Sequence, residues 1–409
     1  MIRLYIILGG LLIFGYVQPI IDNRYFPLFR RQTLTTIGCQ SKLNAAFYFL
    51  TSDEARDFDN KRIGIPELWG KFNQVTISKS LTLIGKPDPL DPQYQTQKEL
   101  IWDWEGKISG QGFHFSYERP IVCNFSVGML WDAMHVQSRN SFLLSKTIKT
   151  DIVNISQSQI DELGRDRRQI NKELGLDTGM WSKTGFSDLD IYLKYSWLRE
   201  YCYKIRKIDA SLNLGFLLPT ATKRDINNPA SMSFGGNGFT GIYFSPEVNL
   251  ELKEDWIFGC SFTLLKRFPK TTFQRMPVND EPIQYGVVTG DVRINPGFTC
   301  GLLAYVQLLD FWDAIGFRAG YHLVGHAQDR WCDMRKDKTI PVTLSEVEKH
   351  SSWISEYVCL SAVFNFCEYR QFQKIEPKLY LEADIPIHLF CARDISRTVR
   401  VSIGIEAAF

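Results

Sequence analysis

Twelve segments of this chain alternate apolar and polar side chains, and the connections between them alternate in length. The segments are residues 43–51, 112–117, 122–134, 189–197, 208–218, 242–252, 256–268, 294–308, 312–323, 353–366, 375–389 and 397–409. A period of two places successive side chains on opposite faces of a β-strand. In 375–389, for example, Leu381 and Ile385 lie on one face and Glu382 on the other. Most of these segments are long enough for tilted transmembrane strands of roughly 9–11 residues.

Connection lengths test this interpretation independently. The connections 52–111, 135–184, 220–236, 269–293 and 324–352 are long, and 118–121, 202–204, 253–255, 309–311 and 367–371 are short. Outer-membrane barrels have short periplasmic turns and long outer loops, whereas a soluble sandwich has no reason to sort its loops in this way. We therefore predict an all-β fold: a closed antiparallel transmembrane β-barrel of about twelve strands in the bacterial outer membrane. Fourteen strands are the alternative if 71–83 contributes part of a further hairpin.

The outer loops hold one helical pattern, at 156–174, in which Ile160, Leu163, Ile170 and Leu174 recur at helical spacing. Its opposite face is densely charged. Two placements are open: a solvated helix that caps the barrel mouth, or a helix that folds into the lumen and gates it.

Both ends of the chain carry targeting patterns. Arg3 precedes an uncharged run at 4–17, which predicts a signal peptide over residues 1–22, with an N-terminal membrane anchor as the alternative. The barrel then occupies 23–409. The last strand ends on Phe409, which we expect the barrel-assembly machinery to read as an assembly signal. The expected partners are this machinery, outer-membrane lipid and a small-molecule solute.

Composition excludes several other classes. The 47 Lys and Arg nearly balance 45 Asp and Glu, so a nucleic-acid partner is not expected. His322 and His326 have no neighbouring nucleophile motif, and the nine cysteines and six histidines show no zinc spacing. We expect no enzyme, metal or cofactor. Cys332 and Cys391 are the one cysteine pair placed in loops on the same side.

If the apolar faces contact lipid, the polar faces line the lumen. The predicted pore-lining residues are Asp190, Lys194, Asp209, Glu247, Glu251, Arg318, Lys374, Glu376, Lys378, Glu382, Asp384, Arg400 and Glu406. Such charges need water or partners, so they line an aqueous path or form a closed network that fills the interior. Aromatic residues near strand ends predict interfacial girdles: Tyr195, Trp197, Trp256, Phe311, Trp312 and Trp353. Gly235–Gly238 (GGNG) lies in a loop, without the strand–helix context of a phosphate cradle.

The stretch 188–259 contains DLDIYLKYSWL, IDASLNLGFLLPTATKRD, GGNGFTGIYFSPEVNLEL and WIFG. With the terminal strand, it resembles the outer-membrane proteins of the phenol meta-degradation pathway family. These relate loosely to fatty-acid and aromatic-hydrocarbon channels. The resemblance implies a closed barrel that passes small molecules, with hydrophobic ones among the candidates, and carries over no catalytic residue. The first functional hypothesis is therefore a pore for passive uptake of small solutes. The alternative is a non-conducting structural or surface-interaction barrel that uses its outer loops.

Overall fold

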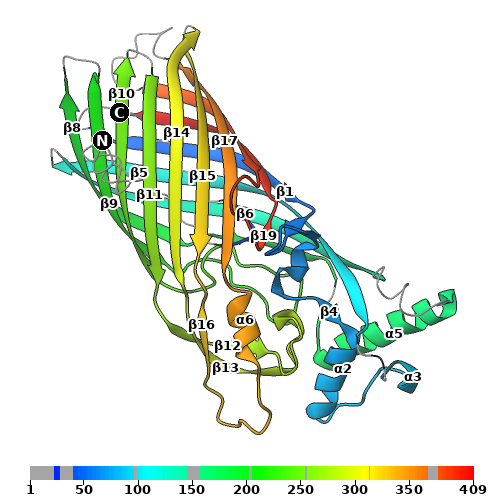
Figure 1. Ribbon diagram of the computed structural model, residues 1–409. Coiled ribbons are helices and arrows are strands. Elements are labelled where there is room, and N and C mark those ends of the chain that lie inside the picture. Colours follow the sequence, from blue (N-terminus) through cyan, green and yellow to red (C-terminus); the bar gives the residue numbers. More distant parts are fainter. Residues whose placement is uncertain are drawn as a thin grey trace, which may run out of the picture.

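The computed structural model describes residues 23–27, 40–95, 97, 99–122, 124–144, 156–177, 179–201, 205–253, 256–312, 314–366 and 376–409. In these residues twelve strands form an antiparallel barrel (Figure 1). They are β1 (Lys42–Ser52), β5 (Ile101–Val122), β6 (Phe125–Leu144), β8 (Leu189–Glu200), β9 (Lys207–Leu218), β10 (Gly241–Lys253), β11 (Trp256–Arg267), β14 (Phe298–Trp312), β15 (Ile315–His326), β17 (Trp353–Asn365), β18 (Glu376–Pro386) and β20 (Val399–Ala408). Each pairs with the next, and β1 closes the barrel by pairing with both β5 and β20.

The predicted fold class and strand count are confirmed. Segment 71–83 does not add a barrel hairpin: it forms the short strand β4 (Phe72–Asn73) and helix α2 (Gln74–Leu83). The long connections gather at one end of the barrel and the short turns at the other, as the parity of their lengths predicts (Figure 1). Within the described part of the chain, none of the helices is long and apolar enough to cross a membrane.

Side chains alternate between the two faces of the barrel wall. On β20, Val401 and Ile405 are 42% and 55% exposed, whereas Arg400 is 1% exposed. The same apolar outward face recurs on the other barrel strands, with exposed side chains such as Phe47, Phe113, Ile191, Phe216, Phe244, Phe258, Phe317 and Leu381. An apolar exterior on a wall without an unpaired edge is the arrangement that lipid requires. The chain is therefore a transmembrane barrel of the outer-membrane type.

The hairpin of β5 and β6 extends beyond this apolar belt. In the half of β5 near the short turn, Phe113 faces outward and His114 is buried. In the half toward the cap the polarity of the two faces is reversed, because Lys107 is exposed outward while Trp102 and Trp104 are buried inward. Since outward side chains must be apolar in lipid and polar in water, this reversal marks the outer boundary of the membrane on this hairpin.

The long loops fold together into a cap on the outer end. Its elements are β2 (Ala55–Arg56), β3 (Arg62–Ile63), η1 (Ile65–Trp69), β4, α2, α3 (Pro92–Gln95), α5 (Gln157–Leu174), β7 (Trp181–Phe186), β12 (Lys270–Met276), η2 (Ile283–Tyr285), β13 (Val288–Asn295), β16 (Arg330–Asp333), α6 (Leu344–Lys349) and β19 (Ile395–Ser396). Strands β12, β13 and β16 form one small sheet, and β19, β2 and β3 another. A shared core joins α2, α5, β5, β12, η2 and β13 through buried side chains that include Leu81, Leu163, Trp104, Met276 and Tyr285.

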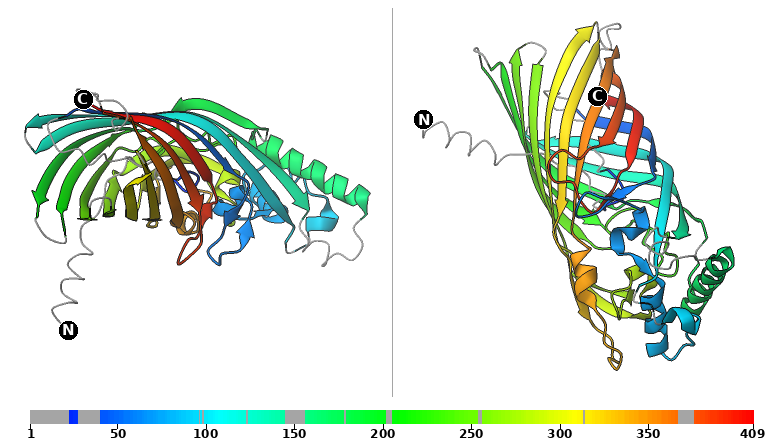
Figure 2. Two further views of the ribbon diagram at one scale, coloured as in Figure 1. Left: turned by 90° about the horizontal axis from the view of Figure 1, so that it is seen from above. Right: turned by 45° about the vertical axis from the view of Figure 1, so that its right-hand side comes forward.

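Helix α5 confirms the helical pattern predicted at 156–174. Ser156 caps its N-terminus and Gly175, with φ 66°, ends it. Leu163 and Ile170 are buried in the cap core, and the helix lies beside the extended β5–β6 hairpin, beyond the barrel end (Figure 2). Of the two placements predicted for this helix, it therefore occupies the capping one.

Candidate functional site

The interior wall carries the polar side chains that strand parity predicts. Asp190, Lys194, Glu247, Glu382, Asp384, Arg400 and Glu406 face inward and are buried, and Asp209, Glu251, Arg318, Glu376 and Lys378 face inward with partial burial. Lys374 lies outside the described residues. The structure thus places the described members of the predicted set on one interior surface. Their role in lining a pore remains a proposal, taken up below.

Several of these charges are partnered between strands that are adjacent or one strand apart. Arg400 on β20 forms ion pairs with Asp384 and Glu382 on β18, the latter at 3.4 Å. Lys194 lies 3.9 Å from Glu247. The Tyr243 hydroxyl donates to Asp190 Oδ2 at 2.8 Å. Paired, buried charges of this kind form a network on the wall.

Five buried wall tyrosines each lie over a glycine of the adjacent strand. The directly opposed pairs are Tyr48–Gly112, Tyr192–Gly128, Tyr243–Gly215, Tyr305–Gly259 and Tyr380–Gly404. In each pair a Cβ added to the glycine would meet the tyrosine ring. The absence of a glycine side chain therefore lets each ring lie against the wall, rather than project toward the barrel axis.

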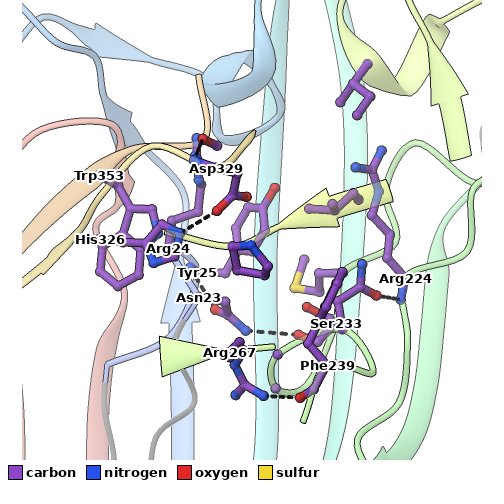
Figure 3. Close-up of a pocket in the computed structure, with 18 of the residues that line it drawn as sticks. Asn23, Arg24, Tyr25, Arg224, Ser233, Phe239, Arg267, His326, Asp329 and Trp353 are labelled. Atoms are coloured by element: carbon purple, nitrogen blue, oxygen red, sulfur yellow. Dashed lines mark hydrogen bonds and ion pairs between the residues drawn. The ribbon is translucent and has the colours of Figure 1, made fainter. Parts of the chain in front are cut away.

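A pocket of about 150 Å³ lies at the outer mouth, where the barrel meets the cap (Figure 3). Residues from widely separated parts of the chain converge there: Asn23–Tyr25, Trp69 of η1, the loop 224–239, the end of β11, the β12–β13 hairpin, and 326–353. We call it the outer-mouth pocket. Its walls combine tryptophans (Trp69, Trp331 and Trp353) with arginines (Arg24, Arg224 and Arg267).

The N-terminal segment Asn23–Pro27 contributes its first three residues to this pocket, although β1 begins at the opposite end of the barrel. The side-chain amide of Asn23 donates to the backbone carbonyl of Ser233 at 3.0 Å. The Arg24 guanidinium donates to two backbone carbonyls: that of Leu68, at 3.0 Å, and that of His350. The Ser396 amide donates to the Arg24 carbonyl at 3.0 Å. Four cap segments thus hold this segment at the mouth.

Two acidic groups of the pocket region are already engaged. Asp188 Oδ2 lies 2.9 Å from Arg267 Nη2 and accepts the Gly236 amide at 2.8 Å. Asp329 Oδ1 lies 2.9 Å from His326 Nε2 and accepts the Gly297 amide at 2.8 Å. The GGNG loop has a steric role here, because a Cβ on Gly236 would overlap the Arg267 guanidinium. As predicted, it has no helix context for a phosphate cradle.

Other residues singled out from the sequence have different outcomes. The prediction that Trp353 belongs to an interfacial girdle is wrong. This side chain is 4% exposed and stacks on His326 in the pocket, with ring centroids 5.7 Å apart. Tyr195, Trp197, Trp256 and Phe311 are exposed near the short-turn end, where a girdle is expected. The side chain of Trp312 lies outside the described residues. Cys332 and Cys391 are free and exposed rather than joined.

Phe409 is 49% exposed, and its backbone pairs with Ser41; its role as an assembly signal remains a prediction. Among the described residues, no group of three His, Cys, Asp or Glu side chains is placed to hold a metal ion.

Comparisons with known proteins find likeness in structure alone. No family model and no curated protein matches the sequence. The COG4313 outer membrane channel from Pseudomonas putida F1 is 8% identical, with 91% of this chain and 97% of that chain covered and a TM-score of 0.48. A Pseudomonas aeruginosa FadL homologue is 9% identical, with 90% of each chain covered and a TM-score of 0.32. A mutant TodX monoaromatic hydrocarbon channel is 7% identical, with 91% and 90% covered and a TM-score of 0.32.

These are channels of the general kind named by the sequence resemblance. Membership of this chain in the phenol-pathway family itself remains a prediction. At such identities and TM-scores, none of the likenesses assigns a solute to this chain.

Proposed function

We propose that this protein is an outer-membrane channel for the passive passage of small solutes, with hydrophobic molecules among the candidates. The observation that carries the proposal is the outer-mouth pocket, a solute-sized cavity at the mouth of a closed barrel. Ligand pockets are typically concave and apolar with a few fixed polar groups, and the mouths of β-barrels are a common place for them. The apolar exterior supports the membrane location.

The proposed route leads from this pocket along the interior wall. The wall tyrosines lie against their glycines, which keeps large rings close to the wall. The inward charges then set selectivity by their field, as side chains that line a pore do. Since Asn23–Pro27 is hydrogen-bonded to the cap at the mouth, we infer that the path opens when this segment moves.

Single-channel conductance of the refolded, full-length protein in a planar bilayer tests this function. We expect discrete steps that are brief in the wild type and longer-lived in Arg24→Ala, which loses the bonds to Leu68 and His350. Arg165→Ala, on the exposed face of α5, is the matched control and should behave as the wild type. Folded protein that stays silent in all three forms would refute the channel and leave the outer loops as the functional surface.

A second variant tests the interior wall. Glu382→Gln removes one inward charge, keeps the side-chain shape and leaves Arg400 paired with Asp384. We expect the reversal potential in a salt gradient to shift toward anions. Glu105→Gln, on the exposed outer face of the β5 extension, is the control. An unchanged ion preference in Glu382→Gln would remove this residue from the proposed pore lining.

A further inference from the structure

The outer-mouth pocket holds more cationic than anionic groups. Three arginines and one aspartate line it, and Asp329 is already bound to His326. Arg267 is paired with Asp188. Among the described residues, neither Arg24 nor Arg224 forms an ion pair. Asp394 and Asp329 lie near Arg24, and Asp225 lies near Arg224, but none of them forms an ion pair with these arginines. The pocket therefore presents two guanidinium groups without a directly bound carboxylate.

Both cations lie by the same indole ring. Arg24 is 5% exposed, and its Cζ lies 4.3 Å from the centroid of the Trp69 ring. The Cζ of Arg224 lies 6.0 Å from that ring. Burial lowers the pKa of both guanidinium groups below the usual value. Because removing a charge from water without a counter-charge is costly, an anion that enters this pocket gains two favourable partners.

The rest of the wall suits a flat apolar body. Trp331, Trp353, Phe239, Met232 and Ile283 contribute apolar surface. The cavity volume of about 150 Å³ is that of an apolar cavity known to admit benzene, about 150 Å³. Aromatic rings also pack favourably against tryptophan at offset or edge-on angles. Size and lining thus favour one aromatic ring.

We propose that the outer-mouth pocket binds a small aromatic carboxylate, with the carboxylate near the guanidinium groups by Trp69 and the ring against the tryptophans. Arginine is suited to this task, because its planar fork of donors matches the two oxygens of a carboxylate. This inference rests on the proposed channel function, and it names the class of solute that the channel selects at its mouth.

Equilibrium binding to the refolded, full-length protein tests the proposal, with intrinsic tryptophan fluorescence as the readout. The probes are benzoate, its neutral counterpart benzyl alcohol, acetate as a carboxylate without a ring, and inorganic phosphate. We expect saturable binding of benzoate and at least tenfold weaker binding of the other three. Benzyl alcohol that binds as tightly as benzoate would refute the anion site. Acetate or phosphate that binds as tightly as benzoate would refute the proposed recognition of the aromatic ring.

Variants assign the binding to the arginines. Arg224→Gln should weaken benzoate binding at least tenfold, Arg224→Lys should weaken it less, and the exposed control Arg165→Gln should leave it unchanged. A heat-modifiable band on gel electrophoresis shows that each variant is folded. Benzoate binding that is unchanged in folded Arg224→Gln would overturn the proposal.

Conductance measured on the same samples separates this inference from the channel function. Discrete steps without benzoate binding would refute the ligand class and leave the channel standing. Benzoate binding to a protein that is silent in bilayers would support the site and refute the channel.

Discussion

Replacement of Gly128 by alanine tests the pairing of tyrosines with glycines on the barrel wall. Gly128 on β6 lies directly opposite Tyr192 on β8, and a Cβ at this position would overlap the Tyr192 ring. Tyr192 is 3% exposed, and its hydroxyl donates to Glu118 Oε2 at 3.2 Å. The added methyl group must therefore displace the ring from the wall.

The magnitude follows from two contributions. Overpacking of a filled site costs about 1–3 kcal/mol. Loss of the buried hydrogen bond to Glu118 adds about 1–3 kcal/mol. We therefore expect Gly128→Ala to lower the free energy of unfolding by about 2–6 kcal/mol. Denaturant unfolding of the barrel, followed by tryptophan fluorescence and heat-modifiability, measures this loss.

Gly301 on β14 provides a matched control. It also faces inward, but the nearest atom to a Cβ at this position is Thr263 Cβ, at 3.6 Å, an ordinary contact. Gly301→Ala should therefore be neutral or stabilising by up to about 1 kcal/mol, because alanine loses less backbone entropy on folding.

A double-mutant cycle with Tyr192→Ala completes the test. The cost of Gly128→Ala should disappear when the ring is absent. Equal effects of Gly128→Ala and Gly301→Ala, or a cost that persists in the Tyr192→Ala background, would refute the steric account.

Three further predictions concern the cap. Leu163→Ala should destabilise the cap by about 2–5 kcal/mol, because this buried side chain leaves a cavity; added protease should then cleave the loops while the barrel stays heat-modifiable. Gly236→Ala should displace Arg267 from its buried ion pair, at a cost of about 3–5 kcal/mol, and show the same cleavage pattern. The hydrogen bonds from Arg335 hold the pKa of Asp333 below its ordinary value of 3.8, so this pair stabilises β16 above that pH and is lost as the carboxylate protonates. At about pH 5 the wild type should therefore be cleaved by pepsin near β16 more slowly than Asp333→Asn, and this difference should disappear toward about pH 3.

The barrel could be predicted from the sequence because lipid imposes one fixed apolar face on each strand. The same rule failed to predict the half of β5 that extends toward the cap. Its inward side chains change from His114 to Trp104 as the strand leaves the membrane, so a search for one constant apolar face finds only 112–117. The segment predicted at 294–308 likewise joined the end of β13 to β14, although Pro296 and Gly297 separate the two strands.

The interior charges could be predicted for the same reason, since parity alone assigns a strand residue to one face. The outer-mouth pocket could not. Arg24, Trp69, Arg224 and His326 are far apart in the chain, and loops have no periodicity from which to infer proximity. Trp353 shows the limit of composition, because a tryptophan near a strand end suits an interfacial girdle and a pocket wall equally well.

The shared core of the cap has a consequence for the order of assembly. Its buried side chains come from the loops after β1, β6 and β11, among them Leu81, Leu163 and Met276. The connection that supplies Met276 reaches the outer side only with the hairpin of β11 and β14. The N-terminal segment in turn bonds to Ser396, next to the last strand. The cap can therefore be completed only after nearly the whole barrel has inserted. A fully folded cap on the cell surface thus indicates that assembly of the barrel is complete.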